Sequence, residues 1–485
     1  MDPSTICCPY LPGWEYIADG EPHVFGDRLY VFGSHDRFNG KRFCMNDYVV
    51  WSAPLSDLSH WECSGISYRK DQDPDNSNGK IELWAPDVAL GPDGRYYLYY
   101  CLANNPKIGV AVSNKPEGPY EFLDHVHDNK GGILGVREGD ILPFDPAVLV
   151  DRDGSVHLYE GQGPMFEKDI KNKAKTRQYA WHIELESDMV TMKTEPVPVI
   201  PSLINSKGTG FEGHEFFEAS SIRRFGDKYY FIYSSVLAHE LCWAVSDRPD
   251  SGFVYGGTLV SNGDIGLHDN SYVGFSVKPD HAIFNYAGNN HGSVEEINGK
   301  YYVFYHRQTN RHMYSRQACV APIIMKADGS FVQAEMTSSG LSEALPGKGA
   351  YEARIACELY SKDGALFSVH PFFQNKKHPS FTQDEPDGNN ARQYISNIRD
   401  GATAVFKYFD FDVNESIELI VRGKCEGTIE IFTNENDNPV TIVRISSSDK
   451  WTKYHAPFKP SSGRYPLLFS FKGKGSLDFY GFEMR

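Results

Sequence analysis

Five ionisable side chains stand at a similar place in five similar segments of this chain. They are Asp19, Asp87, Asp145, Glu218 and His291, and they precede the turn glycines Gly26, Gly94, Gly154, Gly226 and Gly299 by seven to nine residues. If the segments form equivalent units, these side chains converge on one centre. Carboxyl groups that meet there, partly out of water, cannot all ionise normally, so at least one pKa is raised. A carboxyl of raised pKa beside one of ordinary pKa suits glycoside hydrolysis, because the first protonates the leaving oxygen and the second activates water.

Each acid taken alone also has a structural explanation, since an aspartate beside glycine or proline is commonly a turn residue. The shared offset favours the functional interpretation. The local sequences add to it, because Asp145 lies in FDPAV and Glu218 in FFEASS. Aromatic neighbours of this kind lower the local dielectric and offer faces on which a sugar can stack.

The elements that must position these residues are hairpins. Each turn glycine leads into a strand of alternating aromatic and aliphatic residues, as in GDRLYVFGS from Gly26 and NGKYYVFYHR from Asn298, and the glycines are 68, 60, 72 and 73 residues apart. Asp-Gly and Asn-Gly pairs favour hairpin turns. Four strands fit in each repeat, and a repeat of this size buries its faces only against neighbours. The pattern therefore predicts an all-β fold with a five-bladed β-propeller over residues 1–345.

A second domain is predicted over residues 351–485. The segment 337–350 is rich in serine and glycine, and short strand patterns such as SIELIVRG and GTIEIFTN follow it. Turns recur every 8–14 residues, which is typical of a β-sandwich of the jelly-roll type.

Composition narrows the range of partners. The 485 residues carry a formal net charge of −16, which disfavours nucleic acid and anionic membranes, and no apolar run reaches the ~18 residues of a membrane helix. The first residues show no signal-peptide pattern, and nine scattered cysteines suggest reduced thiols, so a cytoplasmic location is expected. An exported protein whose leader has been removed is the alternative. The oligomeric state is not predicted.

Several motifs resemble those of glycoside hydrolase family 43. They are WAPDV (Trp84–Val88), FDPAVLVDRDG (Phe144–Gly154), FFEASSI (Phe216–Ile222) and NHGSV (Asn290–Val294). A first motif, Ala18-Asp19-Gly20, precedes Ser34-His35-Asp36 at the family's spacing, with glycine where the family usually has proline. The resemblance implies a propeller and an inverting mechanism, with Asp19 as general base, Asp145 as the residue that tunes the acid, and Glu218 as general acid. Glu21 and Glu215 are the rival positions for base and acid.

The same resemblance implies roles for residues around the acids. Trp84 is expected to stack on a sugar, Asp87 to bind a hydroxyl and Arg316 to orient the substrate, while His35, Phe217 and Tyr286 form the pocket wall. His291 is expected to approach a water or a structural calcium ion on the propeller axis, and the chemistry requires no cofactor. The alternatives are a core tryptophan, a surface ion pair for Arg316 and a buried histidine bonded to the backbone.

The C-terminal domain is similar to family 6 carbohydrate-binding modules. The matching segments include YISNIRDGATAVFKYFDFD and the terminal LDFYGFEM. Where that family often has Glu-Ala-Glu, this chain has Tyr351-Glu352-Ala353-Arg354, which keeps only the first acid. A role in supporting the propeller is therefore favoured over binding of polymer.

The function these patterns predict is that of an exo-glycosidase acting on an oligosaccharide substrate. It would remove terminal α-L-arabinofuranosyl or β-D-xylosyl residues from fragments of arabinoxylan, xylan or arabinan. The alternatives are a non-catalytic carbohydrate-binding propeller and a family 43 enzyme acting on galactan-type glycans. A retaining fructan hydrolase is disfavoured, since such enzymes carry Arg-Asp-Pro and Glu-Cys where this chain has Phe-Asp-Pro and Glu-Ala.

Overall fold

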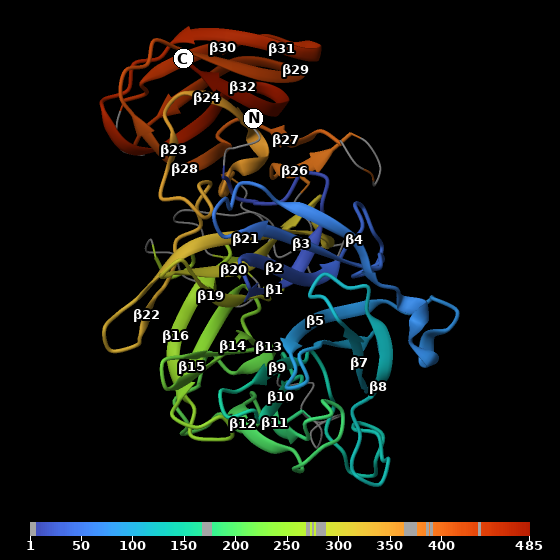
Figure 1. The fold of residues 1–485 in the computed structure, drawn as a ribbon. Helices are drawn as coiled ribbons and strands as arrows, with labels where there is room; N and C mark the ends of the chain where they lie inside the picture. The colour runs from blue at the N-terminus through green and yellow to red at the C-terminus, as the bar shows by residue number, and fades with distance from the viewer. Residues whose placement is uncertain are drawn as a thin grey trace.

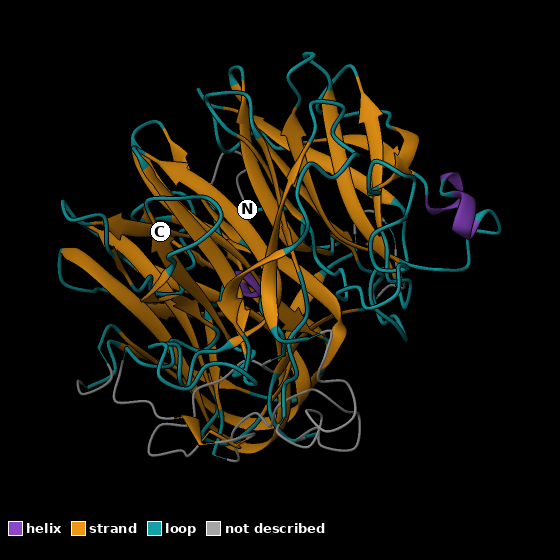
Figure 2. Cartoon of the chain, turned by 90° about the horizontal axis from the view of Figure 1, so that it is seen from below, coloured by secondary structure: helices purple, strands orange, loops and turns teal. Residues whose placement is uncertain are grey.

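Among the described residues, nearly all of the regular secondary structure is β-strand. The computed structural model describes residues 6–166, 177–267, 272–273, 276–277, 288–362, 376–384, 388, 391–434 and 438–485. The only helical elements among them are three 3₁₀ turns, η1 (Lys70–Gln72), η2 (Pro74–Asn76) and η3 (Ala353–Ile355) (Figure 2). In the same residues, no helix has the length and apolar character needed to cross a bilayer.

Five four-stranded antiparallel sheets form the first domain (Figure 1). Blade I has β1 (Ile17–Phe25), β2 (Arg28–His35), β3 (Tyr48–Pro54) and β4 (Glu62–Tyr68), and blade II has β5 (Leu83–Leu90), β6 (Tyr96–Leu102), β7 (Ile108–Ser113) and β8 (Glu121–His125). Blade III has β9 (Ala147–Val150), β10 (Val156–Glu160), β11 (Tyr179–Leu185) and β12 (Val197–Pro201), and blade IV has β13 (Phe216–Phe225), β14 (Lys228–Ser235), β15 (Glu240–Ser246) and β16 (Val254–Ser261). Blade V has β19 (Ser293–Ile297), β20 (Lys300–Thr309), β21 (His312–Met325) and β22 (Phe331–Val332), and the short pair β17 (Tyr272–Val273) and β18 (Ser276–Val277) precedes it.

Alternating side chains hold the ring together. In β2, Leu29 and Val31 join the core shared with blade V, while Tyr30 and Phe32 join the core shared with blade II. The other three propeller cores likewise lie between neighbouring blades. A bridge between Gly20 and Gly292 links blades I and V, so the ring is closed. The predicted five-bladed propeller is confirmed. Its strands alternate with period two, and each sheet buries both of its faces against the neighbouring blades.

The inner strands show which residues are equivalent. At one level, called the lower level here, stand Glu21, Asp87, Ala147, Ser221 and Ser293, which pair with Phe32, Tyr99, Tyr159, Ile232 and Phe304. Two residues earlier, at the upper level, stand Asp19, Ala85, Asp145, Ala219 and His291. The predicted equivalence of all five ionisable residues is therefore corrected in two cases. Glu218 lies one residue before the upper level and Asp87 lies at the lower level, because the hairpin turns differ in length and bulges interrupt β1, β5 and β13.

The second domain is one curled sheet of ten strands around its own core. Its strands are β23 (Leu345–Pro346), β24 (Gly349–Glu352), β25 (Glu358–Tyr360), β26 (Ser380–Gln383), β27 (Gln393–Ile398), β28 (Thr403–Phe411), β29 (Ser416–Phe432), β30 (Thr441–Ile445), β31 (Ser448–Pro457) and β32 (Gly463–Met484). The long strands β29 and β32 pair along most of their length. The sheet begins at Leu345, a few residues before the predicted domain start at 351.

The two domains are packed against each other. The N-terminal segment contributes Cys7 to the core of the second domain and Leu11 to a propeller core. Arg354 of η3 donates hydrogen bonds to the carbonyls of Pro9 and Leu11, both at 3.3 Å. In Figure 1 the second domain accordingly lies directly on the propeller, beside blade V.

Candidate functional site

A cavity of about 160 Å³ lies at the upper level of the inner strands. It is lined by Asp19, Phe43, Cys44, Trp84, Ala85, Phe144, Asp145, Gln162, Glu218, Asn289, His291 and Arg316, which together come from all five blades. The cavity thus brings together the three predicted catalytic carboxyls and the predicted Trp84, His291 and Arg316.

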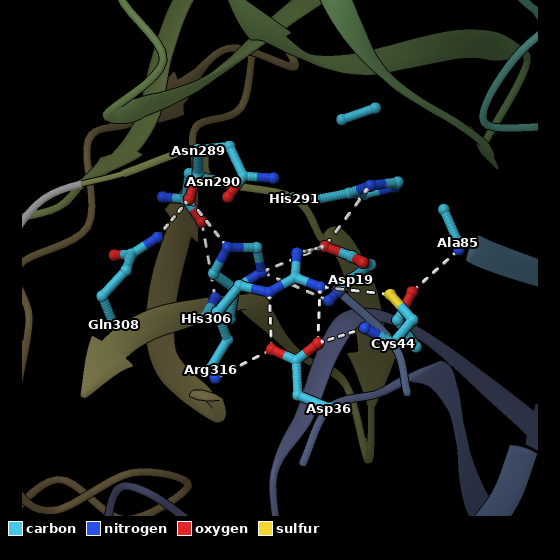
Figure 3. A network of polar contacts seen from close by, with 12 residues as sticks. Asp19, Asp36, Cys44, Ala85, Asn289, Asn290, His291, His306, Gln308 and Arg316 are labelled. Atoms are coloured by element: carbon cyan, nitrogen blue, oxygen red, sulfur yellow. Dashed lines mark hydrogen bonds and ion pairs between the residues drawn. The ribbon is translucent and has the colours of Figure 1, made fainter. Parts of the chain in front are cut away.

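Asp19 is held by a buried arginine (Figure 3). Nη1 of Arg316 donates to Oδ1 of Asp19 at 2.7 Å, and its Nε and Nη2 donate to the carboxylate of Asp36 at 2.9 and 3.0 Å. Arg316 is 1% exposed, and its guanidinium lies 4.7 Å from the ring centre of Phe43. Two-point pairing with Asp36 fixes the guanidinium plane, so its remaining amino group points at Asp19.

This arrangement keeps Asp19 ionised. Burial alone would raise its pKa, but the charge of Arg316, with the neighbouring His291 and His306, lowers the pKa to about 2. Nδ1 of His306 also accepts the backbone N–H of Asp19 at 3.2 Å. Asp19 itself has φ of 53°, a left-handed backbone that is uncommon for non-glycine residues and concentrates at functional sites.

The carboxyls of Glu218 and Asp145, in contrast, have raised pKa values. Burial raises the pKa of Glu218 to about 7, and the charge of Asp19 adds to this effect while a hydrogen bond from Gln162 opposes it. Burial, together with the charges of Glu218 and Asp19, raises the pKa of Asp145 well above its usual range. Oδ2 of Asp145 accepts the backbone N–H of Ala219 at 3.0 Å, so the residue next to Glu218 is tied to Asp145.

Aromatic rings line the wall beside the carboxyls. The ring centre of Trp84 lies 5.6 Å from that of Phe144 and 6.4 Å from that of Phe43, and both pairs are edge-to-face. Such rings exclude water and present apolar surface to the C–H face of a sugar.

His291 lines the cavity and lies near carboxyls of both levels. Its Nδ1 is 3.8 Å from both Oδ1 of Asp19 and Oδ2 of Asp145, and its Nε2 is 4.0 Å from Oε1 of Glu21. Burial lowers the pKa of His291 to about 4, so the ring is neutral near pH 7. Oε1 of Glu21 is buried and has no hydrogen-bond partner among the described residues, whereas Oε2 accepts from Arg223 and Ser221.

Three other predicted site residues lie outside the cavity lining. Asp87 is fully buried at the lower level, where it pairs with His23 at 2.7 Å and accepts the backbone N–H of Val148. His35 contacts Glu15 through Nε2 at 3.0 Å. The backbone carbonyl of Phe217 accepts from Gly163, while its side chain is only half-buried. None of the three lines the cavity, and their contact with a substrate stays a prediction.

The two rival acids also lie outside the cavity lining. Glu21 is at the lower level and Glu215 accepts a hydrogen bond from Ser206, so neither rival acid lines the cavity. Tyr286 lies outside the described residues.

Sequence reasoning missed Phe43, Cys44, Ala85, Gln162 and Asn289 in the cavity wall, and Asp36 and His306 behind it, whereas Phe144 was expected only as an aromatic neighbour of Asp145. The string EGQG at 160–163 carried the available signal for Gln162, because two glycines directly after a strand indicate a close backbone approach. Asp36 was within the recognised Ser-His-Asp motif but was given no role.

Comparison with known proteins identifies the family. The model of the family described as glycosyl hydrolases family 43 matches residues 22–331. The chain belongs to glycosyl hydrolase family 43. It is therefore a glycoside hydrolase, and the resemblance of the propeller motifs to family 43 is confirmed.

Relatives of this family 43 enzyme cover between two thirds and nearly all of it. A xylosidase/arabinosidase from Thermoclostridium stercorarium is 48% identical over 478 residues, which are 98% of each chain. A xylosidase/arabinosidase from Bacteroides ovatus is 30% identical over 67% of this chain and 97% of its own. The solved structure of a family 43 arabinoxylan arabinofuranohydrolase from Bacillus subtilis covers 99% of this chain and 97% of its own, with 21% identity and a TM-score of 0.51, and shares the fold.

Proposed function

We propose that this enzyme is an inverting exo-glycosidase that releases terminal α-L-arabinofuranosyl or β-D-xylosyl residues from plant-cell-wall oligosaccharides. The observation that carries the proposal is the division of three cavity carboxyls into two kinds. Arg316 holds Asp19 as a carboxylate, while burial raises the pKa of Glu218 to about 7 and raises that of Asp145 well above its usual range. One ionised base and one protonated acid are what single-step hydrolysis with inversion needs.

The roles follow from this division. Glu218 donates its proton to the glycosidic oxygen as the bond from that oxygen to the anomeric carbon breaks. Asp19 takes a proton from a water that attacks the opposite face of the same carbon, so the new C–O bond forms with inverted configuration. Asp145 accepts the backbone N–H of Ala219 and so holds the strand segment that carries Glu218, while the charge of Asp19 favours the protonated form of Glu218.

The substrate class rests on the size of the cavity and on the relatives. The cavity of about 160 Å³ is smaller than the ~300–1,000 Å³ of typical ligand sites, which favours one terminal sugar over an internal stretch of polymer. Trp84, Phe43 and Phe144 supply the apolar wall. Two relatives are named xylosidase/arabinosidase, and we extend both sugars to this chain.

The test is release of p-nitrophenol from the α-L-arabinofuranoside, β-D-xyloside and β-D-galactoside. We expect turnover of one or both pentosides and little of the galactoside. Turnover of the galactoside alone would indicate a galactan-type enzyme. No turnover of any of the three, with binding of the free sugars, would indicate a carbohydrate-binding propeller instead.

We also propose a structural calcium ion on the propeller axis beside His291. The 4.0 Å between Nε2 of His291 and the unpartnered Oε1 of Glu21 leaves room for a cation, and waters would supply most of its oxygen ligands. Its contribution would be to stability, since no step of hydrolysis requires it. We expect calcium to raise the midpoint of thermal unfolding after treatment with chelator. An unchanged midpoint, with no calcium in the purified protein, would exclude the ion.

The second domain is proposed to support the propeller, and the enzyme to act in the cytoplasm on short oligosaccharides. Arg307 of β20 supports the first proposal, since its guanidinium lies 3.7 Å from the ring centre of Phe381 and donates to the carbonyls of Arg354 and Ala356. Cell fractionation tests the location. Binding of the protein to insoluble xylan would argue against a purely supporting role.

A further inference from the structure

The short segment Glu160–Gly163, at the end of β10, lies between the two carboxyls of raised pKa. The N–H of Gly161 donates to the carbonyl of Phe144 at 2.8 Å, and the N–H of Gly163 donates to the carbonyl of Phe217 at 2.6 Å. Phe144 directly precedes Asp145, and Phe217 directly precedes Glu218. The segment therefore bonds to the backbone beside both acids, across the boundary between blades III and IV.

The side chains of the segment strengthen the same connection. Oε2 of Glu160, which is fully buried, accepts the N–H of Phe144 at 3.0 Å. Nε2 of Gln162 donates to Oε2 of Glu218 at 3.2 Å, and Gln162 lines the cavity. Among the described residues, the side-chain amide of Gln162 therefore links this backbone segment to the carboxyl of Glu218.

The glycines on either side of Gln162 make this approach feasible. Gly161 has φ of +139°, which side chains rarely adopt. A Cβ on Gly163 would lie 2.4 Å from the carbonyl oxygen of Phe216. Larger residues at these positions would push the segment away from β13, and Gln162 with it.

We propose that Gln162 is a positioning residue that holds the general acid through one oxygen and leaves the other to carry the proton. An amide N–H bonded to Oε2 blocks protonation there, so the proton of Glu218 resides on Oε1. The same bond fixes the carboxyl plane relative to the substrate. This inference rests on the proposed function, because it gives Gln162 a role only if Glu218 acts as the acid.

The charged groups that face Glu218 define what Gln162 changes. Asp19 on β1 and Arg316 on β21 are charged, Asp145 before β9, His291 before β19 and Cys44 after β2 are titratable, and the amides of Gln162 and Asn289 are neutral. The amide of Gln162 favours the ionised form of Glu218 and so lowers its pKa. Removing the amide raises the pKa of Glu218 and moves the upper pH limit of activity to higher pH.

The test compares Gln162→Met with the wild type on two substrates of the same sugar. One is p-nitrophenyl β-D-xyloside, whose leaving group needs little protonation, and the other is xylobiose, whose leaving group needs full protonation; the matching arabinosides serve if arabinose is the sugar released. We expect kcat/KM to fall about tenfold on xylobiose and less than about threefold on the nitrophenyl glycoside. The upper limb of the pH profile should move to higher pH.

Gln162→Glu is the second variant, because it keeps the size of the side chain if Gln162→Met fails to fold. A carboxyl beside Glu218 should move the upper limb further in the same direction. Gln72→Met is the matched control, since the amide of Gln72 donates to the carbonyl of Tyr120 at 2.9 Å away from the cavity, and its activity should equal that of the wild type.

Equal losses on both substrates, or an unmoved upper limb in both variants, would overturn the inference. Wild-type protein that cleaves neither substrate would instead contradict the proposed function, so the two failures are distinguishable.

Discussion

Arg316 gives the carboxyls of one small cavity different protonation states. Its Nη1 is 2.7 Å from Oδ1 of Asp19, whereas the side-chain hydrogen bonds of Glu218 come from the neutral amides of Gln162 and Asn289. Charge assistance from a guanidinium outweighs the cost of burial for Asp19, and the absence of such a partner leaves burial dominant for Glu218. Asp19 and Glu218 are both carboxyls in the same cavity, so their hydrogen-bond partners decide which is the base and which is the acid.

The pH dependence of activity follows from these pKa values. Asp19 must be ionised, so activity is lost only as the pH falls through about 2 or the protein unfolds. Glu218 must be protonated, so activity is lost as the pH rises through about 7. The measurement is kcat/KM between about pH 4 and about pH 9, a range that covers the ordinary pKa values of carboxyl and histidine groups. We expect a plateau at low pH and a single upper limb near pH 7. A lower limb near the usual carboxyl range would indicate that Arg316 does not control Asp19.

Single residues were predictable where a motif carried them. Asp19, Asp145, Glu218, Trp84, His291 and Arg316 all line the cavity. Phe43 was not predictable, because it comes from a loop whose path depends on the packing of neighbouring blades, and the only signal for Gln162 was its pair of flanking glycines.

At the scale of elements, the site depends on strands that end at a common level. Asp19 lies on β1, Asp36 follows β2 and Arg316 lies on β21, so three elements from two blades meet at one guanidinium. Asp36 also accepts the backbone N–H groups of Arg316 and Cys44, both at 2.9 Å. This carboxylate therefore joins the first and last blades of the ring directly behind the base.

Asp36→Asn should lower kcat by about 10–100-fold, because the amide cannot fix the guanidinium plane and a small displacement of Arg316 disturbs Asp19. The measurement is kcat beside the midpoint of thermal unfolding. Asp151→Asn is the matched control, since Asp151 pairs with Arg224 away from the cavity. Both variants should lose stability, but only Asp36→Asn should lose kcat. Equal kcat in the two variants would show that Asp36 has a structural role alone.

The element scale also shows why a count along the sequence was insufficient. The shared offset predicts that residues seven to nine positions before a turn glycine are equivalent, but a longer turn in blade II and the bulges in β1, β5 and β13 shift the register. Asp87 was assigned to the substrate for this reason, although it lies two residues deeper, against His23. Register in a sheet is fixed by pairing partners, which one sequence does not display.

At the scale of the whole molecule, a buried lysine connects the two domains. Nζ of Lys407 on β28 lies 3.1 Å from Asp264, 2.9 Å from Glu335 and 2.6 Å from Glu358. The first two acids belong to segments that leave β16 and β22 of the propeller, and the third lies on β25. Burial alone would lower the pKa of Lys407, but the charges of Glu358 and Asp264 raise it.

Lys407→Met should therefore destabilise the junction strongly. Three acids would be left together without their cation, and removing one partner of a buried ion pair typically costs about 3–5 kcal/mol. Lys472→Met, which removes an exposed lysine paired with Glu430 on the same domain, should cost less than about 1 kcal/mol. Denaturant unfolding of both variants measures the difference. Equal stability of the two would show that the cluster contributes little to the junction.

The domain plan itself was evident from the sequence, because turn glycines and period-two strands report blades directly. The junction was not, since Lys407, Asp264 and Glu358 are far apart in the chain and no pattern pairs them. Their charges become informative only once folding has buried them together.

The central claim is that Asp19 acts as base and Glu218 as acid. Its most direct test is kcat/KM of Asp19→Asn and Glu218→Gln on aryl pentosides with leaving groups of increasing pKa. We predict that Glu218→Gln keeps most activity on the best leaving group and loses about 10²–10⁴-fold on the poorest, whereas Asp19→Asn loses activity on all of them. Full activity of Glu218→Gln on the poorest leaving group, or of Asp19→Asn on any, would contradict the account.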